Sequence, residues 1–245
     1  MNDKAALIQA FSAIPYSAPQ QPSMPLSCEI SATGLVCLLG QQFSVINAYM
    51  QMLAGANEPY KGSIDFADSL LNASDKNNCP AIAYLYHNSA LLSYLNGIDN
   101  VKVPALYHQL ASTTEIDKEV YALIGEFEYG ANHLILPAFM STLQRRHLLI
   151  VRAIMLKPKI LFIENPFSGL DRDQVRVFGQ YLSGLVKNKN ITVITSNANL
   201  DFVRSYADQI IYITTANVHV FDHWQNFSDY IRGLNKSAKT FNKMP

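Results

Sequence analysis

Charged residues are scarce in this chain, and neither sign is in excess. Only 16% of its 245 residues are charged, and the 19 basic and 19 acidic side chains cancel. No net field therefore draws the protein to nucleic acid or to an anionic surface, and we expect no nucleic-acid partner. The 49% of hydrophobic residues suffices for the core of one large domain, or of a domain with an inserted subdomain.

Cysteines and long apolar runs are also scarce. Cys28, Cys37 and Cys79 lack the spacing of metal ligands, and we predict reduced thiols, as in the cytosol. No apolar run reaches the roughly 18 residues of a membrane span. Asp3 and Lys4 precede a short amphipathic stretch that lacks the apolar core of a secretory signal. We expect a cytoplasmic protein that reaches a membrane only through a partner.

Prolines and apolar runs divide the first quarter of the chain. Four prolines within residues 11–27 predict an extended lead-in or an edge hairpin, with the core beginning after it. The apolar run 35–39 ends at Gly40 and is typical of a strand buried on both faces of a parallel sheet. A helix is predicted over residues 45–54, where Gly55 ends it.

Strand and helix signals then alternate to the end of the chain. Further strands are predicted over 81–86, 160–163, 191–195 and 209–213, the last strand of the chain. Residues 88–156 are mostly helical in character, with breaks at Pro104 and Pro137, and another helix is expected over 173–187. A polar, lysine-containing tail from Asn235 onward is expected to be disordered. This alternation favours a parallel sheet covered by helices on both faces.

Four sequence motifs are spread along nearly the whole chain: GQQFSVIN at 40–47, MSTLQ at 140–144, ILFIENPFSGLD at 160–171 and ADQI at 207–210. Together they resemble the motifs of ABC transporter ATPases. The resemblance implies an α/β P-loop NTPase fold, with a mostly parallel sheet and an inserted helical subdomain. Residues 1–87 and 155–245 would form the RecA-like nucleotide-binding core, and residues 88–154 the helical subdomain. The SALL stretch at 89–92, with Asp99, Asn100, Val101 and Pro104, looks most like bacterial branches that move phospholipids or lipoproteins.

The segment at the position of the phosphate-binding loop lacks most of the residues that bind phosphate. A working loop follows GxxxxGK[ST], where backbone amides wrap the phosphates, lysine neutralises them and the hydroxyl holds magnesium. Gly40 and Ser44 remain, but Val45 replaces the second glycine, Ile46 the lysine and Asn47 the hydroxyl. The resemblance implies ATP and Mg²⁺ as cofactors, and these substitutions argue against binding in the usual mode. Tyr16 is the candidate for stacking on an adenine, with an ordinary surface tyrosine as the alternative.

Four further positions of the family's chemistry are altered. Glu164 stands where the family has the magnesium-shell aspartate and is the one possible metal ligand. Asn165 stands at the general base and has no charge with which to take a proton from water. His87 aligns with the glutamine that senses the γ-phosphate and the membrane partner, or is a plain surface histidine. Ala198 occupies the switch-histidine position, unless a slip of one residue places Asn197 there.

The signature motif is half retained, whereas the D-loop is intact. Ser141 and Gln144 survive in the signature, but Thr142 and Leu143 replace its glycines; Ser141 alternatively serves as a helix N-cap. The D-loop reads Ser168, Gly169, Leu170 and Asp171. Because the family's D-loop crosses the subunit interface, its retention favours a dimer of this chain with itself or with a sister ATPase.

Three hypotheses follow from the resemblance. The first is a catalytically silent or impaired ATP-binding-type subunit that docks on a membrane permease, at the inner face of the cytoplasmic membrane. It would serve an envelope lipid or lipoprotein transport complex. The second is an active ATPase with non-standard residues, in which Lys61 or a partner's lysine supplies the missing charge. The third is a scaffold or regulator outside transport, so the sequence leaves enzymatic activity open.

Overall fold

A six-stranded, mostly parallel sheet forms the centre of the molecule. The computed structural model describes residues 6–16, 23–71, 80–126, 133–196 and 199–241. The strands follow the order β5-β6-β7-β3-β8-β9, with only β9 antiparallel to its neighbour. They are β5 (Ile82–Leu85), β6 (Ile160–Glu164), β7 (Thr192–Ser196), β3 (Leu35–Gly40), β8 (Gln209–Ile213) and β9 (Val218–Phe221). The predicted strands therefore lie side by side.

A second, antiparallel sheet lies beside the first and has the order β2-β1-β4. Its strands are β1 (Ala6–Ile14), β2 (Leu26–Ser31) and β4 (Lys61–Phe66). The expectation that the core begins only after residue 27 was wrong, because Ile8, Ala10 and Ala13 of the central strand are already buried. Pro15 follows the end of β1 and Pro25 precedes β2, so these prolines bound a hairpin connection.

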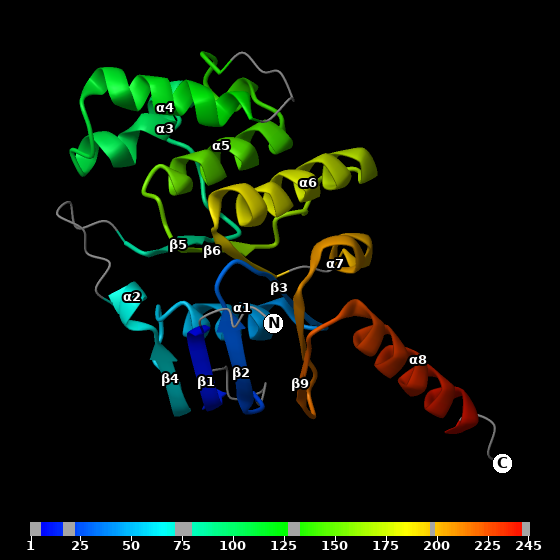
Figure 1. Cartoon of the computed structure of the whole chain (residues 1–245). Helices are drawn as coiled ribbons and strands as arrows, with labels where there is room; N and C mark the ends of the chain where they lie inside the picture. The colour runs from blue at the N-terminus through cyan, green and yellow to red at the C-terminus, as the bar shows by residue number, and fades with distance from the viewer. Residues whose placement is uncertain (1–5, 17–22, 72–79, 127–132, 197–198, 242–245) are drawn as a thin grey trace.

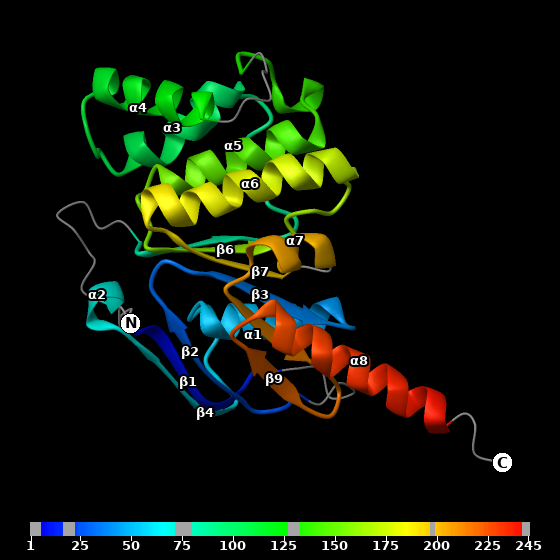
Figure 2. The same cartoon turned by 45° about the vertical axis from the view of Figure 1, so that its right-hand side comes forward.

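Alternation along the buried strands divides the interior into two cores. In β3, Leu35, Cys37 and Leu39 face one core, whereas Val36 and Leu38 face the other. Helices α5 (Thr142–Ile154) and α6 (Arg172–Lys189) cover the first side, as Figure 1 shows. Helix α1 (Phe43–Leu53) packs on the other side, with the antiparallel sheet (Figure 2). Gly55, with a φ of 70°, follows α1 at its end, as predicted.

Helices α3 (Gly97–Tyr107) and α4 (Thr113–Gly125) form the upper part of the molecule in Figure 1. Pro104 was predicted to break a helix, but it lies inside α3. Proline has no N–H to donate and its ring crowds the carbonyl four residues earlier, but the helix continues past it, and the His108 amide donates to the Pro104 carbonyl at 3.0 Å. Pro137 does mark a boundary, since it begins a short 3-10 helix, η1 (Pro137–Phe139).

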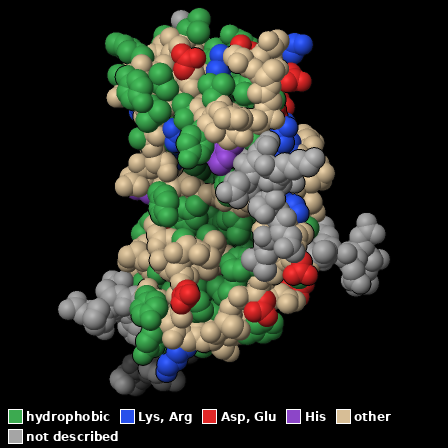
Figure 3. Space-filling view, turned by 90° about the vertical axis from the view of Figure 1, so that its left-hand side faces the viewer, with side chains coloured by type: hydrophobic (Ala, Val, Ile, Leu, Met, Phe, Trp, Pro, Cys, Tyr) green, Lys and Arg blue, Asp and Glu red, His purple; other side chains and the backbone are tan. Residues whose placement is uncertain are grey.

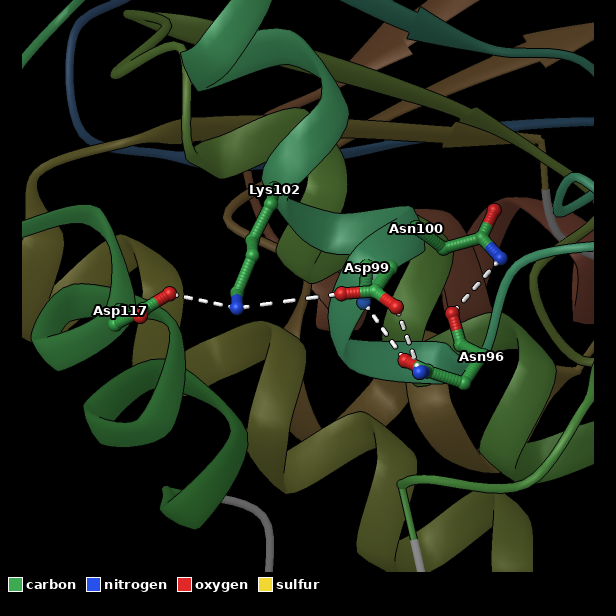
Figure 4. A network of polar contacts seen from close by, with 5 residues as sticks. All are labelled: Asn96, Asp99, Asn100, Lys102 and Asp117. Atoms are coloured by element: carbon green, nitrogen blue, oxygen red, sulfur yellow. Dashed lines mark hydrogen bonds and ion pairs between the residues drawn. The ribbon is translucent and has the colours of Figure 1, made fainter. Parts of the chain in front are cut away.

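Polar contacts hold the upper helices to each other and to the preceding loop. Figure 4 shows Lys102 between Asp99 and Asp117, and its ammonium lies 2.6 Å from the Asp117 carboxylate of α4. This hydrogen bond is the first cause that raises the pKa of Lys102. Asn100 is fully buried; its amide accepts from the Leu92 N–H at 2.7 Å and donates to the carbonyls of three residues within 92–96.

The carboxyl-terminal part contains more structure than predicted. Strand β8 is followed by β9 and by α8 (Trp224–Phe241), so the expected last strand is not the last. The backbone is helical through residue 241, and the expectation of disorder from Asn235 was wrong up to that point. Phe227 of α8 is buried against the first core, and this contact gives the helix its anchor.

The remaining elements are two short helices, α2 (Asp68–Leu71) and α7 (Leu200–Tyr206).

On the face at the amino-terminal ends of the parallel strands, Figure 3 shows hydrophobic side chains in the hollow between the upper and lower parts. In the described part of the chain, every helix is too short or too polar to span a bilayer.

Candidate functional site

The phosphate-loop segment lies at the carboxyl end of β3, and helix α1 begins within it. Gly40 ends the strand, and a Cβ atom there would lie 2.6 Å from the Ile213 carbonyl oxygen, so only glycine fits. Helix α1 already starts at Phe43. The Ile46 N–H consequently donates to the Gln42 carbonyl at 3.1 Å, within the helix, and is not available to a phosphate group.

The position of the phosphate-binding lysine is part of the apolar core. Ile46 is only 5% exposed and packs in the core between α1 and the sheets. Val45 is half-buried beside it, whereas Ser44 is exposed. The Asn47 side-chain oxygen is buried and has no hydrogen-bond partner among the described residues. The apolar surroundings of Ile46 would remove the hydration of a charged group without giving it a partner. This position therefore supplies no positive charge for a nucleotide phosphate.

Glu164 ends β6 and is 7% exposed, with its carboxylate engaged by three donors. Tyr84 donates its hydroxyl to Oε1 at 2.7 Å, and the Gln51 amide donates to the same oxygen at 3.4 Å. The His87 backbone N–H donates to Oε2 at 2.9 Å. Burial first, and then the bond to Glu164, raise the pKa of Tyr84, so this hydroxyl stays protonated and donates.

Asn165 occupies a strained turn directly after β6. Its φ of 45° lies in the left-handed region, which asparagine tolerates better than most residues. Its N–H donates to the Ser196 hydroxyl at 2.8 Å, which joins the ends of β6 and β7. The Arg146 guanidinium of α5 donates to the Asn165 carbonyl at 2.9 Å and also to the Pro166 carbonyl. Asn165 therefore holds a turn, and its amide cannot act as a general base.

A largely apolar cavity of about 450 Å³ opens beside Glu164. It lies between the segment after β5 and the start of α5, and Tyr86, His87, Leu91, Pro137, Arg145 and Ile163 are among its lining residues. His87 is exposed, and its ring centre lies 6.4 Å from that of Phe43. The cavity thus joins His87 and Glu164 to the first turn of α5, which carries the signature-like motif.

The surviving signature residues cap helix α5. The Ser141 hydroxyl accepts from the Gln144 N–H at 3.2 Å, and the Gln144 side chain accepts from the Ser141 N–H at 2.8 Å. This reciprocal pair is a capping box, in agreement with the N-cap alternative for Ser141. Leu143 is 1% exposed and packs in the first core, so this position serves the packing of α5.

The D-loop is an exposed turn that leads into α6. Gly169 is exposed with a φ of 72°, and Ser168 donates its N–H to the Asn165 carbonyl at 3.3 Å. Leu170 is half-buried against the first core. The Asp171 carboxylate caps α6 by accepting from the Gln174 N–H at 2.9 Å. The motif therefore has a local structural role besides any role at an interface.

Tyr16 lies away from the Glu164 contacts, and the switch position lies outside the described residues. Tyr16 is exposed and pairs edge-to-face with Tyr60, at 5.3 Å between ring centres. Lys61 lies over the Tyr60 ring at 5.7 Å. Ala198 and its alternative Asn197 are not described, and neither is Cys79. Cys37 is a buried free thiol and Cys28 a half-buried one, in line with the expectation of reduced cysteines.

ATP with Mg²⁺ does not fit the residues at this site. Glu164 already accepts three hydrogen bonds, and its neighbour Asn165 supplies no charge. Among the described residues, no group of three or more histidine, cysteine or acidic side chains is placed to hold a metal ion. Sequence reasoning identified Glu164 but missed Tyr84, Gln51 and Arg146. These partners come from β5, α1 and α5, and no local sequence pattern signals such a meeting.

No protein-family model matches the chain, whereas individual relatives do. The phosphonates import ATP-binding protein PhnC of Treponema denticola is 24% identical over 221 residues, which cover 84% of this chain and 85% of the relative. The Fe(3+) ions import ATP-binding protein FbpC 1 of Rhizobium meliloti is 27% identical over 215 residues. A molybdenum import ATP-binding protein, ModC of Haemophilus ducreyi, is 24% identical over 207 residues. The chain covers 56% of each of these last two relatives.

Solved structures share the fold of this chain. CbiO1 of Clostridium perfringens, part of an ABC transporter complex, superposes with a TM-score of 0.75 and 21% identity, covering 94% of this chain and 95% of that one. An ATP-binding cassette solved as a dimer in a post-hydrolysis state, bound to ADP and Pi, gives a TM-score of 0.71 at 18% identity. That match covers 88% of this chain and 98% of the cassette.

Proposed function

We infer that this chain, whose homologues are ABC transporter ATP-binding subunits and whose fold is the ABC ATPase fold, is a catalytically impaired or silent subunit. It docks on a membrane permease from the cytoplasmic side and pairs with itself or with a sister ATPase. Residues 1–87 and 155–245 would form its RecA-like core, and residues 88–154 its helical subdomain.

The observation that carries this proposal is the conversion of the phosphate loop into helix and core. Ile46 is buried where the family has a lysine, and its N–H is bonded within α1. A bound triphosphate would need several free amides and a positive charge at this point. Asn165 at the base position adds a second, independent defect, since loss of a general base costs about 10²–10⁴-fold in rate.

Docking on a permease is supported by the cavity beside His87. Its lining is mostly apolar, with Arg145, Arg146 and Glu164 at its polar side, as expected of a surface that receives a protein segment. His87 occupies the position that the resemblance connects to the membrane partner. The exposed turn at Gly169 supports dimerisation, because it offers backbone to a second subunit.

Turnover measurements on the purified chain test the proposal. We expect no Mg²⁺-dependent ATP hydrolysis above that of a matched blank, and no saturable ATP binding at millimolar nucleotide. The same assay on the chain purified with its membrane partners separates a silent subunit from one that activates a sister ATPase. Hydrolysis by the isolated chain that is abolished in Glu164→Gln would overturn the proposal.

An active ATPase with non-standard residues is the second candidate. One observation favours it: α1 begins without a side-chain cap at Gln42, which leaves the positive end of its dipole for an anion. Lys61 is the cation that this candidate invokes, but its ammonium lies over the Tyr60 ring. Tight Mg²⁺-ATP binding that is lost in Lys61→Gln would favour this candidate.

A scaffold or regulator outside transport is the third candidate, and purification separates it from the first. A tagged chain isolated from membranes should bring a permease with it; recovery without any permease would favour the scaffold. The relatives named above are import proteins, so a lipid or lipoprotein cargo rests only on the 89–104 resemblance and stays a prediction.

A further inference from the structure

The segment after β5 is held to the end of β6 by one side chain. Glu164 Oε2 accepts the His87 backbone N–H at 2.9 Å, and this is a charge-assisted bond in a nearly buried place. His87 belongs to the run that lines the cavity proposed above as the permease-docking site, together with Tyr86, Ser89 and Leu91. The position of this wall therefore depends on Glu164.

The carboxylate is itself fixed from two other elements. The Tyr84 hydroxyl of β5 and the Gln51 amide of α1 both donate to Oε1, and Gln51 is oriented by the Asn57 amide at 3.0 Å. Tyr84 is packed between Tyr86, at 4.5 Å between ring centres, and Phe162, at 5.7 Å. With Oε1 held in this way, Oε2 has one orientation, and that orientation points to the His87 amide.

We propose that Glu164 is a positioning residue that fixes the His87 segment in one conformation without nucleotide or metal. The proposal rests on the silent-subunit function and extends it. In the family that the chain resembles, the residue at the His87 position contacts both nucleotide and membrane partner. In this chain an internal carboxylate, anchored by β5 and α1, holds that position instead. The docking cavity would then keep the same shape whether ATP is present or absent.

The length of the Glu164 side chain distinguishes this role from metal binding. Glu164→Gln keeps the reach. The amide oxygen accepts from His87, and the amide nitrogen donates to the Tyr84 hydroxyl, which turns to accept; only the long 3.4 Å contact from Gln51 loses its acceptor. Glu164→Asp keeps the charge but withdraws it by one methylene from the His87 amide. A positioning role thus tolerates glutamine and not aspartate, whereas a magnesium site tolerates aspartate and not glutamine.

Hydrogen–deuterium exchange of the peptide that carries the His87 amide tests the proposal on the full chain. We expect exchange in the wild type to be unchanged by Mg²⁺-ATP, and to rise about 10-fold in Glu164→Asp, the equivalent of one lost charge-assisted bond. Glu164→Gln should stay within about 3-fold of the wild type. Glu58→Gln, at an exposed position without a hydrogen bond among those described, is the matched control.

Two outcomes would overturn the positioning role: exchange in Glu164→Asp equal to that of the wild type, or a wild-type segment that becomes protected when Mg²⁺-ATP is added. Circular dichroism of each variant separates a local effect from unfolding, and Tyr84→Phe, with Tyr86→Phe as its control, repeats the test without changing Glu164. Failure of the silent-subunit function would instead appear as Mg²⁺-dependent ATP turnover. Turnover is measured separately from the exchange of the His87 peptide, so the two failures can be told apart.

Discussion

The starts of α1 and α5 occupy the two motifs that would face nucleotide, and they have changed in different ways. At α5 the residues that survive are Ser141 and Gln144, which cap the helix, whereas buried Leu143 replaces a glycine. At α1 the helix has no side-chain cap and extends into the former loop. The residues that cap the helix persist at α5. The residues that would only bind nucleotide are replaced at both α1 and α5.

The intact D-loop follows the same division. Asp171 caps α6 through Gln174, and Leu170 packs on the first core, so two of its four residues support the local fold. Its retention therefore does not by itself require an interface. A retained motif residue therefore indicates function only where its role in the local fold does not already explain it.

Restoring the signature glycines tests this division with the largest expected effect. Leu143→Gly removes a buried side chain and adds a flexible residue to α5, and should lower the free energy of unfolding by about 4 kcal/mol. Thr142→Gly, half-buried at the adjacent position, should cost only about 1 kcal/mol. Urea denaturation measures both. Equal losses would mean that Leu143 is not part of the core.

Restoring the lysine should damage the fold without restoring chemistry. Ile46→Lys places an ammonium in the second core, and we expect a loss of about 3 kcal/mol with no gain in ATP affinity. Val45→Lys, half-buried one residue earlier, is the control and should cost under about 1 kcal/mol. Calorimetric ATP titration and urea denaturation report the two quantities. An Ile46→Lys protein that is stable and binds ATP would contradict the helical conversion.

His147 makes the α5 region sensitive to pH. Burial first, and then the nearby His133, lower the pKa of His147 to about 3, so the unfolded chain binds a proton more readily than the folded one. Stability is therefore full above the unfolded pKa of about 6.5 and falls as the pH drops. Between about pH 7 and 5, unfolding should become easier by about 2 kcal/mol.

Denaturation at these two pH values checks this expectation. His147→Leu should flatten the dependence, while His223→Leu, at an exposed histidine, should keep it. A slope that persists in His147→Leu would assign the effect to other groups.

Removing the helix caps is expected to have the smallest effect. Ser141→Ala and Asp171→Ala should each lower stability by about 1 kcal/mol, because one first-turn amide loses its acceptor. Ser141→Gly should cost only a few tenths of a kcal/mol at the same place. Thermal melts of the three variants suffice. Losses far above this would indicate that the caps also hold the surrounding tertiary contacts.

Short apolar runs made most strands of the parallel sheet predictable. The run before Gly40 and the run 160–163 both match observed strands to within a residue. The amino-terminal strand was missed because the prolines that follow it, beginning with Pro15, dominated the interpretation of residues 11–27. Helix α8 was missed because its polar tail outweighed the anchor at Phe227. The residues of the phosphate loop indicated lost chemistry, but the helix that replaces the loop needed the backbone.

The contacts of Glu164 could not be read from sequence for a different reason. Its partners lie 113, 80 and 77 residues away along the chain, on three separate elements. Such a meeting depends on the order of the strands in the sheet, which local patterns do not specify.

Arg146 has a mechanical consequence. Its guanidinium joins α5 to two consecutive carbonyls of the β6–α6 turn, and burial lowers its pKa without removing its charge. Rotating α5 away from that turn would leave this partly buried cation without these two acceptors. A movement of α5 would therefore displace the Asn165–Pro166 part of the turn that leads to the D-loop.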